Sequence, residues 1–115
     1  MINWKLYNRR MEKLAIAMTD ARNAANNVTE TPATDIETLR SNIMSYGKAS
    51  KAAGRVCKEC DVDFSSIIGI TANNYNDTMK NLHLSIPIVA SIIETCVTVE
   101  ETEVNESEVN ENEAE

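Results

Sequence analysis

The first thirty residues carry an apolar stripe that constrains the fold more than any other feature of the sequence. Apolar side chains recur there in alternating steps of three and four residues, at Trp4, Tyr7, Met11, Leu14, Met18, Ala21, Ala25 and Val28. Residues at this spacing share one face of an α-helix, so the pattern predicts a long amphipathic helix. Water disfavours an apolar face of this length, and another helix must therefore cover it.

A second stripe with the same spacing begins shortly after Pro32. Proline disfavours helical geometry in the residue before it, and Thr34 followed by Glu37 has the pattern of a capping box at a helix start. The second stripe comprises Ile36, Leu39, Ile43, Tyr46, Ser50, Ala53, Cys57 and Cys60. Two such helices joined by a short loop predict an αα-hairpin. Glycine is costly inside a helix, so Gly47 and Gly54 predict a close contact or a bend there.

Two further helical stretches follow the predicted hairpin. Asp63 and Ser85 are expected N-caps, the second with Pro87 in its first turn, and Gly69 can interrupt the third helix. Aromatic residues make up only 4% of the 115 residues, so the core must come mainly from aliphatic, Met and Ala side chains. We therefore predict an all-α fold, a small helical bundle of about four helices built on the αα-hairpin.

Charge is divided unevenly along the chain. Residues 1–60 hold ten Lys or Arg against six Asp or Glu, whereas residues 96–115 hold eight Glu and no basic residue. A segment this acidic, with so few apolar side chains, cannot bury enough surface to become ordered. We predict a helical domain at 1–97 and a disordered acidic tail at 98–115. The tail either keeps the protein soluble or occupies a basic surface until it is displaced.

The sequence contains no apolar run long enough to span a membrane and no pattern typical of a secretory leader at its amino end. We therefore expect a soluble cytoplasmic protein with no membrane partner. No glycine-rich phosphate loop and no nucleophile motif is present, so we expect neither enzymatic activity nor a cofactor.

Cysteine and histidine residues suggest one metal site. The four candidate zinc ligands are Cys57, Cys60, His83 and Cys96. Their spacing does not match the common zinc modules, in which ligands arrive as two close pairs. Cys57 and Cys60 also occupy the second apolar stripe, so we favour buried packing over zinc binding or thiol exchange.

Residues 63–82 permit a helix-turn-helix interpretation with Gly69 as the turn glycine. Its second helix would present Asn73, Asn74, Asn76 and Lys80 to a DNA groove. Asparagine can read adenine, but segment 61–95 is net negative, whereas phosphate contacts normally need positive charge. The second predicted helix also has a basic face, which we interpret as solvated. It comprises Lys48, Lys51, Arg55 and Lys58.

Four segments within residues 18–74 follow one another in a familiar order. They are MTDARNAA at 18–25, ATDIETL at 33–39, YGKASKAAG at 46–54 and VDFSSIIGIT at 62–71. This order resembles the helical core of phage tail tape measure proteins. Those proteins are far longer, and they usually carry glycine where this chain has Asp61. The resemblance implies a phage or prophage origin and an assembly role, in the host cytoplasm or the virion. It implies no catalytic or cofactor-binding residue.

We therefore expect a non-enzymatic protein that binds other protein surfaces, most simply by forming a homo-oligomer. The expected contact residues lie at the amino end of the first helix, where the chain has least material to cover them: Trp4, Tyr7, Arg10, Met11 and Leu14. Aromatic anchors of this kind dominate interface energies. The alternative is that these are core residues of a monomer. A DNA-binding regulator and a small phage inhibitor of a host defence protein are the other two functional classes.

Overall fold

The structure, a computed structural model, describes residues 1–97. The predicted tail at 98–115, and with it the predicted domain boundary, lies outside the described residues. The described elements are α1 (Trp4–Glu30), α2 (Ile36–Glu59), α3 (Phe64–Ile67), the 3-10 helix η1 (Ile68–Ile70), α4 (Tyr75–Leu84) and α5 (Ile86–Thr95). Between residues 1 and 97 the only β-type pairing is an isolated bridge, so the all-α prediction is confirmed for this part of the chain.

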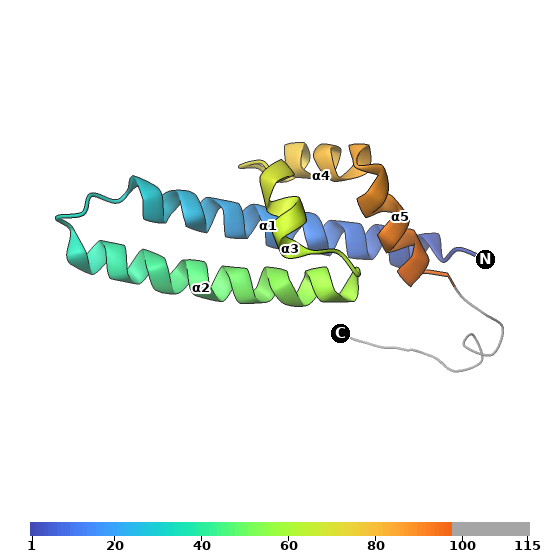
Figure 1. Ribbon diagram of the computed structural model, residues 1–115, viewed down its shortest axis with the longest axis horizontal. Helices are drawn as coiled ribbons and strands as arrows, with labels where there is room; N and C mark the ends of the chain where they lie inside the picture. Colours follow the sequence, from blue (N-terminus) through green and yellow to red (C-terminus); the bar gives the residue numbers. More distant parts are fainter. Residues whose placement is uncertain (98–115) are drawn as a thin grey trace.

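The helices α1 and α2 lie side by side and run in opposite directions (Figure 1). Two contacts fix their register. Near the turn between them, Asn42 Nδ2 donates to Thr31 Oγ1 at 2.8 Å, and farther along the pair Cys57 Sγ lies 3.8 Å from Met18 Sδ. The molecule is elongated, measuring 59 by 27 by 20 Å, because these two long helices set its length.

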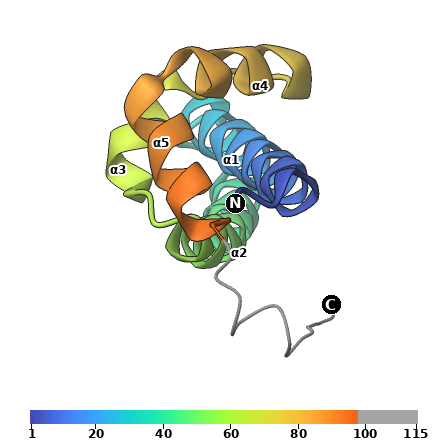
Figure 2. The same cartoon turned by 90° about the vertical axis from the view of Figure 1, so that its right-hand side faces the viewer.

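The shorter elements form a second layer on α1. Viewed down the long axis, α4 lies on one side of α1 and α2 on the other, while α3 and α5 run between the level of α4 and the level of α2 (Figure 2). The layers meet in one continuous core. Its buried members are Tyr7, Met11, Leu14, Ala15, Met18, Ala21, Ala53, Cys57, Cys60, Ile67, Leu82, Ile88, Ile92 and Cys96.

A buried polar node joins α4 to α1. The Thr78 hydroxyl accepts from Thr19 Oγ1 at 2.8 Å and from the Ala72 N–H at 3.0 Å, and it donates to the Ala72 carbonyl at 3.2 Å. All the hydrogen-bonding capacity of this hydroxyl is used, which offsets the cost of burying it. The node therefore holds the loop before α4 against α1.

The predicted capping box at the start of α2 is wrong by one residue. Asp35, not Thr34, is the N-cap, and its Oδ1 accepts from the Thr38 N–H at 3.2 Å. An aspartate in this position satisfies a free N–H and also places negative charge at the positive end of the helix dipole. Asp63 and Ser85 occupy the predicted N-cap positions of α3 and α5, although neither side chain bonds a backbone N–H of its helix.

The third predicted helical stretch is interrupted. It consists of the single turn α3, then η1 around Gly69, then four non-helical residues before α4 begins at Tyr75. The Thr71 hydroxyl donates to the Ile67 carbonyl at 2.8 Å and closes the first part. Asn74 starts the second part, because its Oδ1 accepts from the Asp77 N–H at 2.8 Å. Local side-chain hydrogen bonds of this kind compete with a continuous helix.

Of the two alternatives expected at Gly47 and Gly54, a close contact or a bend, the close contact is wrong within the described chain. A Cβ placed on either glycine meets no atom of a neighbouring segment of residues 1–97 within 4 Å. Both glycines therefore lie beside open space, and no packing between the described elements requires them.

The end of α2 is closed by a Schellman motif. The Asp61 N–H donates to the Lys58 carbonyl at 3.2 Å, and the Val62 N–H donates to the Cys57 carbonyl at 3.0 Å. Asp61 has a φ of 56°, which is the left-handed conformation that this motif requires. Left-handed geometry strains most side chains, whereas glycine adopts it freely.

Truncation of a core side chain on α1 tests the packing. Leu14 is fully buried, whereas Ile16, two residues along the same helix, is 51% exposed. We expect Leu14→Ala to lower the free energy of unfolding by about 2–5 kcal/mol, through lost transfer energy and the cavity left behind. The matched Ile16→Ala control should cost less than about 1 kcal/mol. Urea unfolding of both variants measures the difference, and equal costs would contradict the packing described here.

Replacing Asp61 tests the end of α2. We expect Asp61→Gly to raise the free energy of unfolding by roughly 0.5–1 kcal/mol, because glycine relieves the strain of a positive φ. The control is Asp63→Gly, at a residue with an ordinary extended backbone, which should not stabilise the protein. Thermal unfolding followed by circular dichroism compares the two variants. A loss of stability in Asp61→Gly would show that the aspartate side chain matters more than the backbone strain.

Candidate protein-interaction surface

Half of the α1–α2 pair projects beyond the other helices. Figure 1 shows α3, α4 and α5 over one half only, and the other half ends at the turn between α1 and α2. On this projecting half, three large apolar side chains of α2 face solvent. Ile36 is 59% exposed, Ile43 51% and Met44 61%. The second apolar stripe predicts burial for Ile36 and Ile43, and this prediction is wrong for both side chains.

The exposure follows from what α1 offers opposite these residues. The hydrogen bonds of Asn42 to Thr31 and to the Asn27 carbonyl place Ile43 beside the carboxyl-terminal end of α1, where the stripe carries Ala25 and Val28. The α1 stripe thus ends in small residues where α2 carries large ones. A shallow apolar groove remains along α2, lined by Ile36, Leu39, Arg40, Ile43 and Met44. The shrinking side chains of the α1 stripe were a sequence signal for this groove.

A row of basic side chains continues from this groove along the outer face of α2. Every member is exposed: Arg40, Lys48, Lys51, Arg55 and Lys58. We call these five residues the basic row. Within residues 1–97 none of them forms an ion pair, since the one salt bridge there joins Lys13 to Glu59 at 3.3 Å. The described part of the chain thus gives none of these five positive charges an ion-pair partner.

The structure divides the five predicted protein-contact residues. Tyr7, Met11 and Leu14 are buried in the core, and only Trp4 is largely exposed, at 55%. The Trp4 ring packs edge-on against Tyr7, with ring centroids 5.4 Å apart. Arg10 is half-buried, and its Nη1 donates to the Thr95 carbonyl at 3.0 Å.

The expectation that this end of α1 lacks covering material is therefore corrected. The chain returns through α5, and the Asn3 N–H donates to the Cys96 carbonyl at 2.9 Å. Tyr7 also lies beside His83 of α4, with ring centroids 6.3 Å apart. The return is a contact between residues far apart in the sequence, which local periodicity does not reveal.

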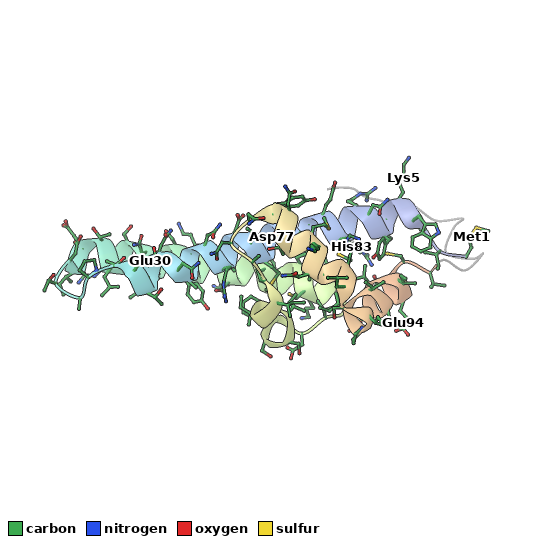
Figure 3. The ribbon with its side chains drawn as sticks, turned by 90° about the horizontal axis from the view of Figure 1, so that it is seen from above. Met1, Lys5, Glu30, Asp77, His83 and Glu94 are labelled. Atoms are coloured by element: carbon green, nitrogen blue, oxygen red, sulfur yellow. The ribbon has the colours of Figure 1, made fainter. Side chains whose placement is uncertain are left out.

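The predicted nucleic-acid residues lie on and before α4. Asn76 and Lys80 are exposed, but Asn74 caps α4 and Asn73 Oδ1 accepts from Asn26 Nδ2 at 2.8 Å. The predicted first helix of the helix-turn-helix is only the four-residue α3. Figure 3 shows α4, with Asp77 and His83 labelled, lying along α1 and away from Glu30 at the projecting end. Asn73 and Asn74 thus form hydrogen bonds within the protein, and the predicted residues do not form one exposed surface that could contact DNA bases.

The four candidate zinc ligands do not come together. Cys57, Cys60 and Cys96 are free, buried thiols, whereas His83 is exposed and its Nδ1 lies 3.0 Å from the Met79 carbonyl of the same helix. Among residues 1–97 no group of three or more His, Cys, Asp or Glu side chains is placed to hold a metal ion. Cys57 and Cys60 instead pack in the core, as their positions in the apolar stripe predict.

Burial also disfavours ionisation of the Cys57 and Cys60 thiols. Desolvation raises the pKa of the Cys57 thiol to about 11, and the negative charge of Asp63 adds to this effect. Desolvation raises the pKa of the Cys60 thiol to about 12, although the Arg10 guanidinium opposes the shift. The thiolate is the form that attacks disulfides and binds metals, and it is scarce at neutral pH.

Thiol modification tests this packing. We expect the native protein to react with a disulfide reagent at pH 8 roughly 100-fold more slowly than the urea-unfolded protein, which corresponds to an opening free energy of about 3 kcal/mol. The native rate should also stay low as the pH is raised toward 9, because both thiols remain protonated there. Rapid native labelling of Cys57 or Cys60, identified by peptide mass spectrometry, would instead support a redox or metal-binding role.

Among the described residues no helix combines the length and apolar character needed to cross a membrane. Comparison with protein families, with curated proteins and with solved structures finds no family model, no protein and no structure that this chain matches.

Proposed function

We propose that this chain is a non-enzymatic helical protein that self-associates through the projecting half of α1 and α2. The observation that carries the proposal is the exposure of Ile36, Ile43 and Met44 around one groove. Soluble proteins scatter single apolar side chains over their surfaces, but a contiguous apolar groove marks an interaction site.

Burial energy favours a second copy as the partner. Complete burial of one such side chain contributes about 1.5–3 kcal/mol, and half of that is available where half is exposed. In a two-fold arrangement each copy contributes the same three side chains, so the gain is counted twice. The total is then roughly 5–9 kcal/mol before the cost of association, which is consistent with a weak, concentration-dependent dimer.

We also propose an assembly role for the chain, with α1 and α2 acting as the αα-hairpin of a four-helix-type bundle and 98–115 as a disordered tail. The resemblance of residues 18–74 to phage tail tape measure proteins supports this role and a phage or prophage origin. Asp61 adds one observation, because its φ of 56° is favoured by glycine, the residue that those proteins usually carry there.

Light scattering coupled to size-exclusion chromatography tests self-association. We expect the measured mass to rise from that of one copy toward that of two copies as the protein concentration is increased. Ile43→Asp and Met44→Glu should each keep the protein monomeric, because a charge in the groove opposes its burial. Circular dichroism checks that both variants remain helical.

The matched control is Leu84→Glu, at an exposed apolar residue on α4 outside the projecting half. This variant should associate like the unaltered chain. A protein that is monomeric at every concentration overturns self-association and favours the alternative of a small inhibitor that binds a host protein. Equal loss of association in Leu84→Glu would move the interface to the other end of the molecule.

A further inference from the structure

The basic row has the geometry of a continuous outward stripe. Its members follow one another in steps of eight, three, four and three residues, and Met44 lies midway along the eight-residue step. This spacing keeps them on one face of α2, which turns away from the side that buries Ala53 and Cys57. Between Arg40 and Lys58 the stripe is about 27 Å long at 1.5 Å per residue.

No acidic side chain of residues 1–97 forms an ion pair with this stripe, and Glu37, three residues before Arg40, is the acidic residue of α2 nearest its amino-terminal end. Glu59 is paired with Lys13 on α1, and Asp35 caps α2 at the far end. Like charges three or four residues apart on a helix repel, and Lys51 with Arg55 is such a pair. Repulsion between the charges of the stripe thus destabilises α2, and binding of negative charges from outside the described residues would relieve this repulsion.

The same chain carries those counter-charges in residues 98–115. Glutamate recurs there in a five-residue repeat, ETEVN at 101–105 and ESEVN at 106–110, followed by ENEAE at 111–115. No basic residue interrupts the segment. Its acidic side chains are Glu100, Glu101, Glu103, Glu106, Glu108, Glu111, Glu113 and Glu115.

Residues 98–115 also begin close to the carboxyl-terminal end of α2, where the basic row ends at Lys58. The Thr95 carbonyl accepts from the Arg10 guanidinium, and the Arg10 carbonyl accepts from Cys60 Sγ, so α5 and α2 end in the same region. Residues 98–115 can extend up to about 60 Å at 3.3 Å per residue. This is more than twice the length of the stripe, and the chain can therefore reach every one of its cations.

We propose that residues 98–115 bind along the basic row of α2 in the same molecule. The contact rests on many solvent-exposed ion pairs, each of which is weak, so it exchanges rapidly and weakens with salt. Covalent linkage compensates for this weakness by holding the segment at a high effective concentration. Any external polyanion or acidic protein surface must then displace the segment before it reaches α2.

Zero-length carboxyl-to-amine coupling of the full chain tests the proposal. At low salt we expect links from the Glu side chains of 98–115 to Lys48, Lys51 and Lys58. The control lysines are Lys13 on α1 and Lys80 on α4, which should couple far less. The links should be lost when salt shortens the screening length to a few ångströms. Coupling at similar yields to the control lysines, or none at α2, overturns the proposal.

A mixture of ¹⁴N- and ¹⁵N-labelled copies separates this proposal from self-association. Links within one copy that persist on dilution support it, whether or not the protein forms dimers. Links only between copies overturn it and instead place the acidic segment on a second molecule.

A variant of the full chain gives an independent measurement. Replacing the eight glutamates of 98–115 by Gln preserves length and removes charge. We expect amide chemical shifts to change along α2 between Arg40 and Lys58 and not along the buried face of α1. A second variant, Lys48→Gln with Lys51→Gln, Arg55→Gln and Lys58→Gln, should abolish the salt dependence of the wild-type shifts. Shift changes confined to 98–115 itself would exclude the contact.

Discussion

Burial of α1 on two sides is the constraint on which the rest of the structure depends. Leu14, Met18 and Ala21 face α2, while Ala15 and Thr19 lie on the side of α1 that meets α4, and all are buried. A helix enclosed on two faces fixes the positions of its neighbours, because close-packed interiors tolerate little displacement. The node at Thr78 and the contact of Arg10 with Thr95 then orient α4 and α5 on this scaffold.

The helix α2 has three different kinds of surface, one buried, one exposed and apolar, and one basic. Its carboxyl-terminal half supplies Ala53, Cys57 and Cys60 to the core, its amino-terminal half leaves Ile43 and Met44 exposed, and its outer face carries the basic row. The division arises because three short elements, α3, α4 and α5, cover only half of a helix pair that is much longer than they are. Apolar and charged surfaces thus lie next to each other on one helix.

Periodicity predicted which faces of the two long helices are apolar, but not how much of each face is covered. From Tyr7 to Ala21 the α1 stripe is buried as expected, whereas Ile43 of the α2 stripe is exposed. Coverage depends on the length and side-chain size of the partner, which are properties of another segment. The site was predicted poorly for the same reason, since the return of the chain through α4 and Cys96 covers Tyr7. The starts of α2, α3 and α5 were predicted to within one residue, because caps depend on local side-chain chemistry, whereas the start of α4 at Tyr75 was not predicted.

The short antiparallel pairing of Ile2 with Val97 has a mechanical consequence. Because it brings the beginning and the end of the described chain together, a load applied at either position enters the molecule at one pole. The turn between α1 and α2 lies at the opposite pole (Figure 1). A protein tethered at the first pole would therefore hold its apolar tip almost the full 59 Å from the anchor.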